Sequence, residues 1–232
     1  MVAILWFSCG AASAVACKIA LEKYPDARII YQETGSAHPD NVRFILDCEK
    51  WYWKKIETIR SPFYADHFDV IRRTRFINGP KGARCTTEIK RKCRKYFEAG
   101  NPGITNQIFG FTVDERDRAE KPEMAGFEFP LIENGITKNQ CYQELHKAGI
   151  ELPMMYQLGF NNNNCICCPK GGMGYFNHCR KIFPELFAKM ALLEREVGHS
   201  CINGVYLDEL DPKAGRHDEP EIACDLFCLM GA

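Results

Sequence analysis

Small and hydroxyl-bearing residues follow the first apolar segment of the chain, at residues 8–13. The Ser8 and Ser13 hydroxyls can donate to phosphate oxygens, and the small residues around Gly10 let an anion approach backbone N–H groups. A helix beginning here would add a partial positive charge of about half a unit. The pattern predicts that Ser8, Gly10 and Ser13 hold a phosphate. The alternative is a tight turn in which Ser13 is an ordinary N-cap.

A second candidate lies at Thr34 and Gly35, directly after the next expected strand and ahead of Pro39. In a doubly wound sheet, ligands bind beside the carboxyl ends of the strands. We therefore expect this segment to border the same site as the first loop. The alternative is a plain strand-to-helix connection.

A strongly basic segment follows at residues 81–95, where seven side chains are basic and one is acidic. Thr86 is a good N-cap, and a helix start flanked by Arg84 and Lys90 suits a phosphate or sulfate group. Nucleic acid could also bind along residues 81–95, although the zero net charge of the whole chain argues against a general nucleic-acid coat protein. The alternative is a solvated helix face.

A charged segment between Gly110 and Arg118 follows the third expected strand. Its position after a strand makes Gly110 and Arg118 candidate ligand-binding residues, and Arg118 a candidate for closing over the ligand. The alternative is a surface loop held by its own salt bridges.

Two close-spaced cysteine groups stand out among the 13 cysteines of this 232-residue chain. Cys165 and Cys168 lie in a polar, Gly-rich loop, and Cys224 and Cys228 lie near the end. Such groups suit tetrahedral thiolate ligation of zinc or of an iron–sulfur cluster. The alternative is buried free cysteines, which is the interpretation we favour for the core candidates Cys9, Cys17, Cys48, Cys93 and Cys141.

The uncharged segment 2–17 is shorter than the ~20 residues that span a bilayer. It also lacks the preceding basic residue of a secretory signal. We expect a buried strand, a loop and a helix start here, and a cytoplasmic protein without a membrane segment. Its cysteines would then be reduced thiols or metal ligands.

Strand and helix patterns alternate through the first half of the chain. Strands are expected at 2–7, 27–32 and 107–112, and helices at 13–24, after Pro39, at 64–74 and at 86–97. This alternation predicts an α/β fold, a Rossmann-like parallel sheet sandwiched by helices.

The second half lacks this alternation and predicts helices at 137–149 and 184–197. We therefore expect a nucleotide-binding α/β domain over residues 1–125. Residues 126–232 would form a helical extension with a Cys-rich loop and tail.

The order of these motifs resembles the phosphoadenosine phosphosulfate (PAPS) reductase family, within the adenine nucleotide alpha-hydrolase-like (PP-loop) fold. The matches run from about residue 4 to about residue 197. They comprise the loop 8–13; Thr34, Gly35 and Pro39; Cys85, Thr86, Ile89 and Lys90; Gly110, Glu115 and Arg118; and Pro130-Leu131-Ile132.

The resemblance implies a sheet holding an adenine nucleotide, with phosphate gripped by the first loop and the basic helix completing the anion site. It implies an enzyme that reduces a sulfonucleotide with a thiol, assisted by a 4Fe–4S cluster and a thiol reductant protein. One alternative is an ATP pyrophosphatase that forms AMP and activates RNA or DNA for thiolation; another is a non-catalytic nucleotide or Fe–S sensor.

The departures from the family pattern bear on these alternatives. Ala11 and Ala12 stand where ATP-splitting relatives have Lys and Asp, which disfavours ATP cleavage. Cys9 replaces the first glycine of the loop. Cys224 could act as a redox nucleophile or ligate a cluster with Cys228, and these two roles compete for one sulfur.

Overall fold

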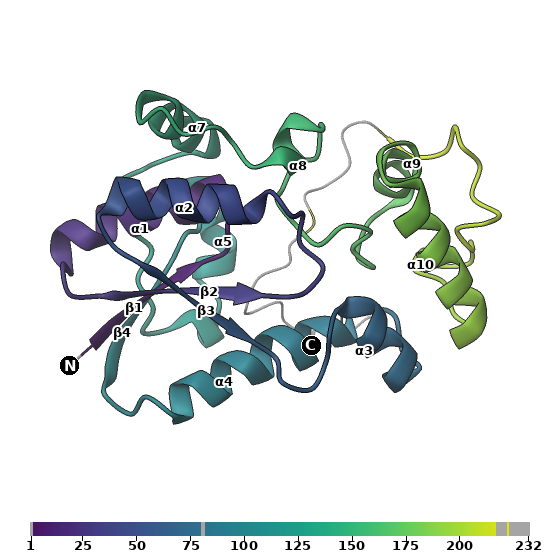
Figure 1. Cartoon of the computed structure of the whole chain (residues 1–232), viewed down its shortest axis with the longest axis horizontal. Coiled ribbons are helices and arrows are strands. Elements are labelled where there is room, and N and C mark those ends of the chain that lie inside the picture. Colours follow the sequence, from purple (N-terminus) through teal and green to yellow (C-terminus); the bar gives the residue numbers. More distant parts are fainter. Residues whose placement is uncertain (1, 80–81, 217–221, 223–232) are drawn as a thin grey trace. The chain divides into compact units, whose positions relative to one another are not determined.

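The computed structural model describes residues 2–79, 82–216 and 222 (Figure 1). Two compact units share the chain. Unit 1 comprises Met1–Gln32, Pro39–Ile59 and Tyr96–Gln157, and unit 2 comprises Glu33–His38, Arg60–Lys95 and Leu158–Ala232. Each unit combines segments from both sides of residue 125.

A four-stranded sheet with the order β3-β2-β1-β4 forms the centre of unit 1. Its strands are β1 (Val2–Phe7), β2 (Arg28–Glu33), β3 (Ile56–Arg60) and β4 (Ile104–Phe109). β1 pairs in parallel with both β2 and β4. The expected α/β architecture with a parallel sheet is confirmed.

The sheet buries both faces, as crossover helices require. Leu5 and Phe7 pack into a cluster with α1 (Ala11–Lys23) and α2 (Asn41–Tyr52), and Figure 1 shows both helices over one face of the sheet. Trp6 points to the other face, where its ring meets Phe97 edge-on at 5.7 Å. This alternation follows from the two-residue period of a strand.

Two strands, β3 and β4, differ from the sequence-based expectation. β3 was missed because it is an edge strand in which only Ile56 is buried, so it lacks an apolar run. β4 begins three residues before the expected position because the polar side chains of Thr105 and Asn106 mask its start. It ends at Phe109, so Gly110 lies just beyond the strand.

Short helices complete unit 1 after β4. Thr137 caps α7, accepting a hydrogen bond from the Gln140 amide, and the helix lies within the predicted range 137–149. The elements are η2 (Val113–Glu115), α5 (Arg116–Ala119), η3 (Pro122–Met124), α6 (Pro130–Glu133), α7 (Lys138–Lys147) and α8 (Met154–Gln157).

Unit 2 contains α3 (His67–Thr74), η1 (Thr86–Arg91), the first half of α4 (Lys92–Ala99), α9 (Met173–Ile182) and α10 (Pro184–Val197). α3 starts later than expected because the Asp66 carboxylate caps it, accepting from the Asp69 amide at 2.7 Å. α10 begins at Pro184 and stops at Gly198, whose φ is +82°, as predicted. Across the described residues, none of the helices combines the length and apolar character required to cross a bilayer.

Candidate functional site

The direction of the crossovers reverses beside β1, because the chain moves from β1 to β2 on one side and reaches β4 on the other. In open parallel sheets, ligands bind at the carboxyl ends of the strands at such a switch point. The carboxyl end of β1 leads into Ser8, and that of β4 leads into Gly110. Both belong to unit 1.

The Ser13 hydroxyl closes the loop at the end of β1. It accepts hydrogen bonds from the Ser8 amide (3.1 Å), the Ser8 hydroxyl (3.0 Å) and the Gly10 amide (3.3 Å). It donates to the Gly10 carbonyl at 2.9 Å. Ser13 is buried whereas Ser8 is exposed, so the Ser13 side chain shapes the loop and Ser8 stands on its surface.

Cys9 adopts a left-handed conformation, with φ of +62°, in which glycine is normally favoured. Its side chain is completely buried, and its thiol donates to the Asn41 carbonyl at a sulfur–oxygen distance of 3.7 Å. The side-chain amide of Asn41 in turn donates to the Tyr31 hydroxyl at 3.2 Å. Cys9 therefore adopts the turn for which the family pattern has a glycine. Its thiol also anchors the loop to the first residue of α2.

The N-terminus of α1 has a glycine, Gly10, as its N-cap, with φ of −108° and ψ of 164°. Glycine offers no side-chain oxygen to the first amides of a helix, which have no partner within the helix. The first turn also contains no acidic residue. The helix start therefore has the charge and the donors that favour an anion.

Gly110 lies against the backbone of the loop. A Cβ atom at this position would come within 2.5 Å of the Ser13 Cα and 2.7 Å of the Ser13 nitrogen. Only glycine permits this approach, which brings two of the sequence-predicted residues together.

Arg118 folds back on its own segment. Its guanidinium forms an ion pair with Glu115 and stacks over the Phe111 ring, 4.4 Å from the centroid. The Glu115 carboxylate also accepts a hydrogen bond from the Thr112 amide at 3.2 Å. These contacts match the salt-bridged loop that the sequence left open, and they place Arg118 beside the end of β4.

In unit 2, Gly35 makes a turn that no other residue could make without strain. Its φ is +70°, and a Cβ atom would lie 1.8 Å from the Ala65 carbonyl oxygen. The neighbouring Thr34 is buried, and its hydroxyl lies 3.3 Å from the Cys165 sulfur. The structure therefore joins the Thr34 segment to the Cys-rich loop, a contact that sequence reasoning did not anticipate.

An internal ion-pair network occupies part of the basic segment. Glu88 is buried, and its carboxylate contacts Arg84 at 3.0 Å and Lys92 at 2.7 Å. The hydrogen bond to Glu88 raises the pKa of Lys92 above its ordinary value. Arg84 thus has an acidic partner in the chain itself, which reduces the charge it offers to a ligand.

Thr86 lies at the start of the π-helical turn η1, and such irregular turns are frequent at functional sites. It is buried, and its hydroxyl oxygen has no hydrogen-bond partner within the described residues. Lys90 is half-buried one turn further on. The three predicted residues in this segment are Arg84, Thr86 and Lys90. Among them, Thr86 has the buried hydroxyl that a ligand oxygen could satisfy.

Tyr175 holds the loop that carries the first cysteine pair. Its hydroxyl donates to the Cys165 carbonyl at 3.0 Å and accepts from the Cys168 amide at 2.9 Å. Cys224 and Cys228, the other proposed ligands, lie outside the described residues. Within the ranges 2–79 and 82–216 and at residue 222, no three His, Cys, Asp or Glu side chains are grouped to hold a metal ion.

The cysteines expected in the core are buried, which confirms that prediction. Burial raises the pKa of Cys48 and of Cys141 to about 12, so both remain neutral thiols at physiological pH. The buried set comprises Cys9, Cys17, Cys48, Cys93 and Cys141.

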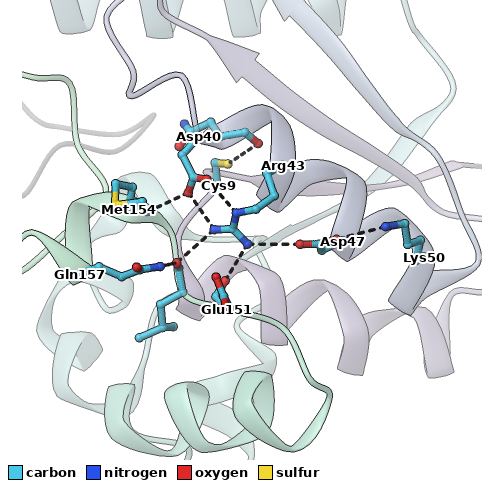
Figure 2. Close-up of polar contacts among 10 residues, drawn as sticks. Cys9, Asp40, Arg43, Asp47, Lys50, Glu151, Met154 and Gln157 are labelled. Carbon is cyan, nitrogen blue, oxygen red and sulfur yellow. Dashed lines mark hydrogen bonds and ion pairs between the residues drawn. The ribbon is translucent and has the colours of Figure 1, made fainter.

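Sequence reasoning missed Tyr156, whose hydroxyl oxygen lies 3.2 Å from the position of a Cβ at Gly10. It also missed the ion pair between Arg43 and Asp40, which holds the chain next to Tyr156 (Figure 2). The Arg43–Asp40 pair is local, but its contacts with the segment 151–154 join positions more than 100 residues apart, so no local pattern marks its role beside Tyr156.

No protein-family model matches the sequence, and no curated protein matches it at a significant level. PAPS reductase from Candida auris, solved as a phosphate complex, matches with a TM-score of 0.52 at 11% identity, over 70% of this chain and 80% of that one. The U34-tRNA thiolase NcsA from Methanococcus maripaludis, solved with its 4Fe–4S cluster, has a TM-score of 0.49 at 13% identity, over 96% of this chain and 78% of that one. Strand order, loop placement and the first of these matches agree: the chain has a PAPS reductase-like, PP-loop fold.

Proposed function

We propose that this chain binds an adenine nucleotide through its anionic groups and acts on it as a PAPS reductase-like enzyme. The observation that carries the proposal is the start of α1 at the switch point. There a glycine N-cap leaves the first amides to an incoming anion, and Gly110 brings the end of β4 against Ser13. Both features favour a ligand group that approaches the backbone closely.

Ser8 is the side chain of the loop best suited to touch that ligand. Ser8 is exposed, whereas the Ser13 hydroxyl is hydrogen-bonded to the backbone of the loop itself. In this proposal the Ser8 hydroxyl turns from the Ser13 oxygen to donate to a phosphate oxygen, Gly10 allows the approach of the phosphate, and Ser13 holds the loop in shape.

Within unit 2, Thr86 is the residue best suited to contact an anion. A buried hydroxyl without a partner costs about 1–3 kcal/mol, a cost that a bound ligand oxygen would remove. Lys90 would add charge at the same helix, while Arg84 shares its charge with Glu88. Thr34, Gly35 and Arg118 are proposed to line the nucleotide.

The proposed reaction consumes two thiols, which become a disulfide, and releases sulfite and the nucleotide from a sulfonucleotide. The electrons would come from a thiol reductant protein. Cys165 and Cys168, which the Tyr175 hydroxyl holds in one loop, are proposed to bind a 4Fe–4S cluster, or zinc, together with Cys224 and Cys228. When bound, such a group would position or polarise the substrate, or would only hold the loop together. Anaerobic purification followed by iron, sulfide and zinc assays tests this part.

Calorimetric titration with PAPS, adenosine phosphosulfate (APS), ATP and AMP tests the nucleotide proposal. The wild-type chain should bind at least one of them, and sulfite should appear when PAPS or APS is mixed with a dithiol. Thr86→Val should weaken binding about tenfold, because it removes one hydrogen bond to a charged group. Thr87→Val is the matched control, since Thr87 lies next to it in the same turn but is only half-buried.

Failure of the folded chain to bind any of these nucleotides would refute the proposal. Pyrophosphate release from ATP, stimulated by RNA or DNA, would instead assign the chain to the ATP-splitting alternative. Tight binding without turnover in the presence of reductant would indicate a sensor.

A further inference from the structure

The phenol oxygen of Tyr156 lies over the loop at the end of β1. A Cβ at Gly10 would be only 3.2 Å from that oxygen, and 3.7 Å from the Ser8 hydroxyl. Because Gly10 is the N-cap of α1, the phenol lies near the residue at which the helix begins. All of these residues belong to unit 1.

The ring of Tyr156 is anchored by packing. It meets the Tyr142 ring edge-on, with centroids 5.5 Å apart, and both rings pack against the buried cluster around α1. The side chain is half-buried, so its ring is held while its polar end reaches the loop.

The backbone of this segment is anchored by the ion pair in Figure 2. The Arg43 guanidinium contacts both oxygens of Asp40 at 2.7 Å. It also donates to the Glu151 and Leu152 carbonyls, each at 3.1 Å. The Asp40 carboxylate accepts a hydrogen bond from the Met154 amide at 2.9 Å, which fixes the first turn of α8.

This arrangement is suited to fixing a side chain in position. A two-point contact between a guanidinium and a carboxylate sets both distance and orientation. Arg43 belongs to α2, which begins directly under the loop where the Cys9 thiol contacts the Asn41 carbonyl. The loop and the segment that carries Tyr156 are thus tied to the same end of one helix.

We propose that Tyr156 is a ligand-binding residue of this loop. Its hydroxyl donates a hydrogen bond to an oxygen of the phosphate or sulfate group that binds at the start of α1. Arg43 and Asp40 are positioning residues that act through α8. This inference rests on the proposed nucleotide binding and adds to it a contact from a part of the chain outside the matched motifs.

The test compares Tyr156→Phe with the matched control Tyr142→Phe. Both variants keep the aromatic pair, and only the first removes the hydroxyl over the loop. Calorimetry with adenosine, AMP and adenosine 3′,5′-bisphosphate separates contacts to the base from contacts to phosphate. Tyr156→Phe should weaken the phosphorylated ligands about tenfold and leave adenosine unchanged, because one hydrogen bond to a charged oxygen is lost. Tyr142→Phe should bind all three ligands like the wild type.

The positioning role is tested by a double-mutant cycle. In an Arg43→Ala background, Tyr156→Phe should change AMP affinity less than twofold, because the hydroxyl is no longer held at the loop. Thermal unfolding confirms that each variant is folded. A purely structural role for Arg43 would leave the tenfold effect of Tyr156→Phe intact in that background.

Three results would overturn the inference. If wild type and Tyr156→Phe bind AMP equally, Tyr156 makes no ligand contact, although the proposed function stands. If adenosine affinity falls as much as AMP affinity, the hydroxyl does not act on the phosphate. If the folded wild type binds no nucleotide at all, the proposed function fails and the inference fails with it.

Discussion

Replacing Gly110 by alanine should damage both the stability of unit 1 and its loop. The new Cβ would lie 2.5 Å from the Ser13 Cα, 2.7 Å from the Ser13 nitrogen and 3.0 Å from the Ala12 carbonyl carbon. All three are backbone atoms at the start of α1, so no side-chain rotation can relieve the overlap. Either the end of β4 or the first turn of α1 must move.

The size of that movement follows from the distances. Ordinary contact begins near 3.4 Å, so the 2.5 Å contact requires a shift of about 0.9 Å. Overpacking of this kind costs about 1–3 kcal/mol. The smaller conformational entropy of alanine in the unfolded chain offsets only about 0.4–1 kcal/mol. We expect Gly110→Ala to lower the free energy of unfolding by about 1–2 kcal/mol.

Gly103→Ala is the matched control, since Gly103 stands just before the other end of β4 and its Cβ would meet nothing within 4 Å. Urea unfolding of both variants, followed by tryptophan fluorescence, measures the free energy of unfolding. Calorimetry with AMP measures the affinity of the loop for its ligand. Gly103→Ala should bind AMP like the wild type and gain about 0.4–1 kcal/mol of stability, whereas Gly110→Ala should lose stability and bind AMP at least tenfold more weakly. A Gly110→Ala chain that is as stable as the control and binds equally well would refute the close approach of β4 to α1.

Further predictions concern unit 2, the thiols and the ion pair. Burial raises the pKa of Glu194 in the folded state. At a pH between the usual carboxyl pKa and this raised pKa, Glu194 is protonated in the folded chain and ionised in the unfolded chain. Wild-type stability should therefore fall as pH rises from about 4.5, and urea titrations should show no such slope for Glu194→Gln. In metal-free protein at pH 8, iodoacetamide should label half-buried Cys165 before Cys48, as mass spectrometry can show; equal rates would contradict the burial of Cys48. Arg43→Ala should destabilise the chain by about 1–3 kcal/mol in urea unfolding, because Asp40 loses its partner. An unchanged midpoint would show that the Arg43–Asp40 ion pair does not hold this segment.

The elements that could be predicted from sequence are those whose signals are local. The apolar run of β1 and the Pro184 and Gly198 boundaries of α10 each lie within one segment, and the structure places these elements where the sequence does. β3 has no such signal, because an edge strand keeps Glu57 and Thr58 exposed and so lacks both a run and a clear alternation.

The candidate site divides in the same way. Residue types at Ser8 and Ser13 indicate an anion loop, but the sequence does not tell which hydroxyl turns inward; the three-dimensional turn at Cys9 decides that. Tyr156 could not be found, because its approach to Gly10 spans 146 positions and depends on the packing of α8. Local chemistry is readable from sequence, whereas contacts between distant segments require the fold.

The construction of the loop also bears on which nucleotide it prefers. Its own donors are backbone amides and the Ser8 hydroxyl, to which Tyr156 is proposed to add its phenol. The positions that follow Gly10 carry the small side chains of Ala11 and Ala12. A helix N-terminus contributes only about half a positive charge, which suits one phosphate or sulfate group better than the tail of ATP. A triphosphate needs a lysine or a metal ion to balance its charge during phosphoryl transfer. We therefore expect AMP to bind at least as tightly as ATP in magnesium-free calorimetry. A tenfold preference for ATP would show that other cations of the chain complete the site and would favour the ATP-splitting alternative.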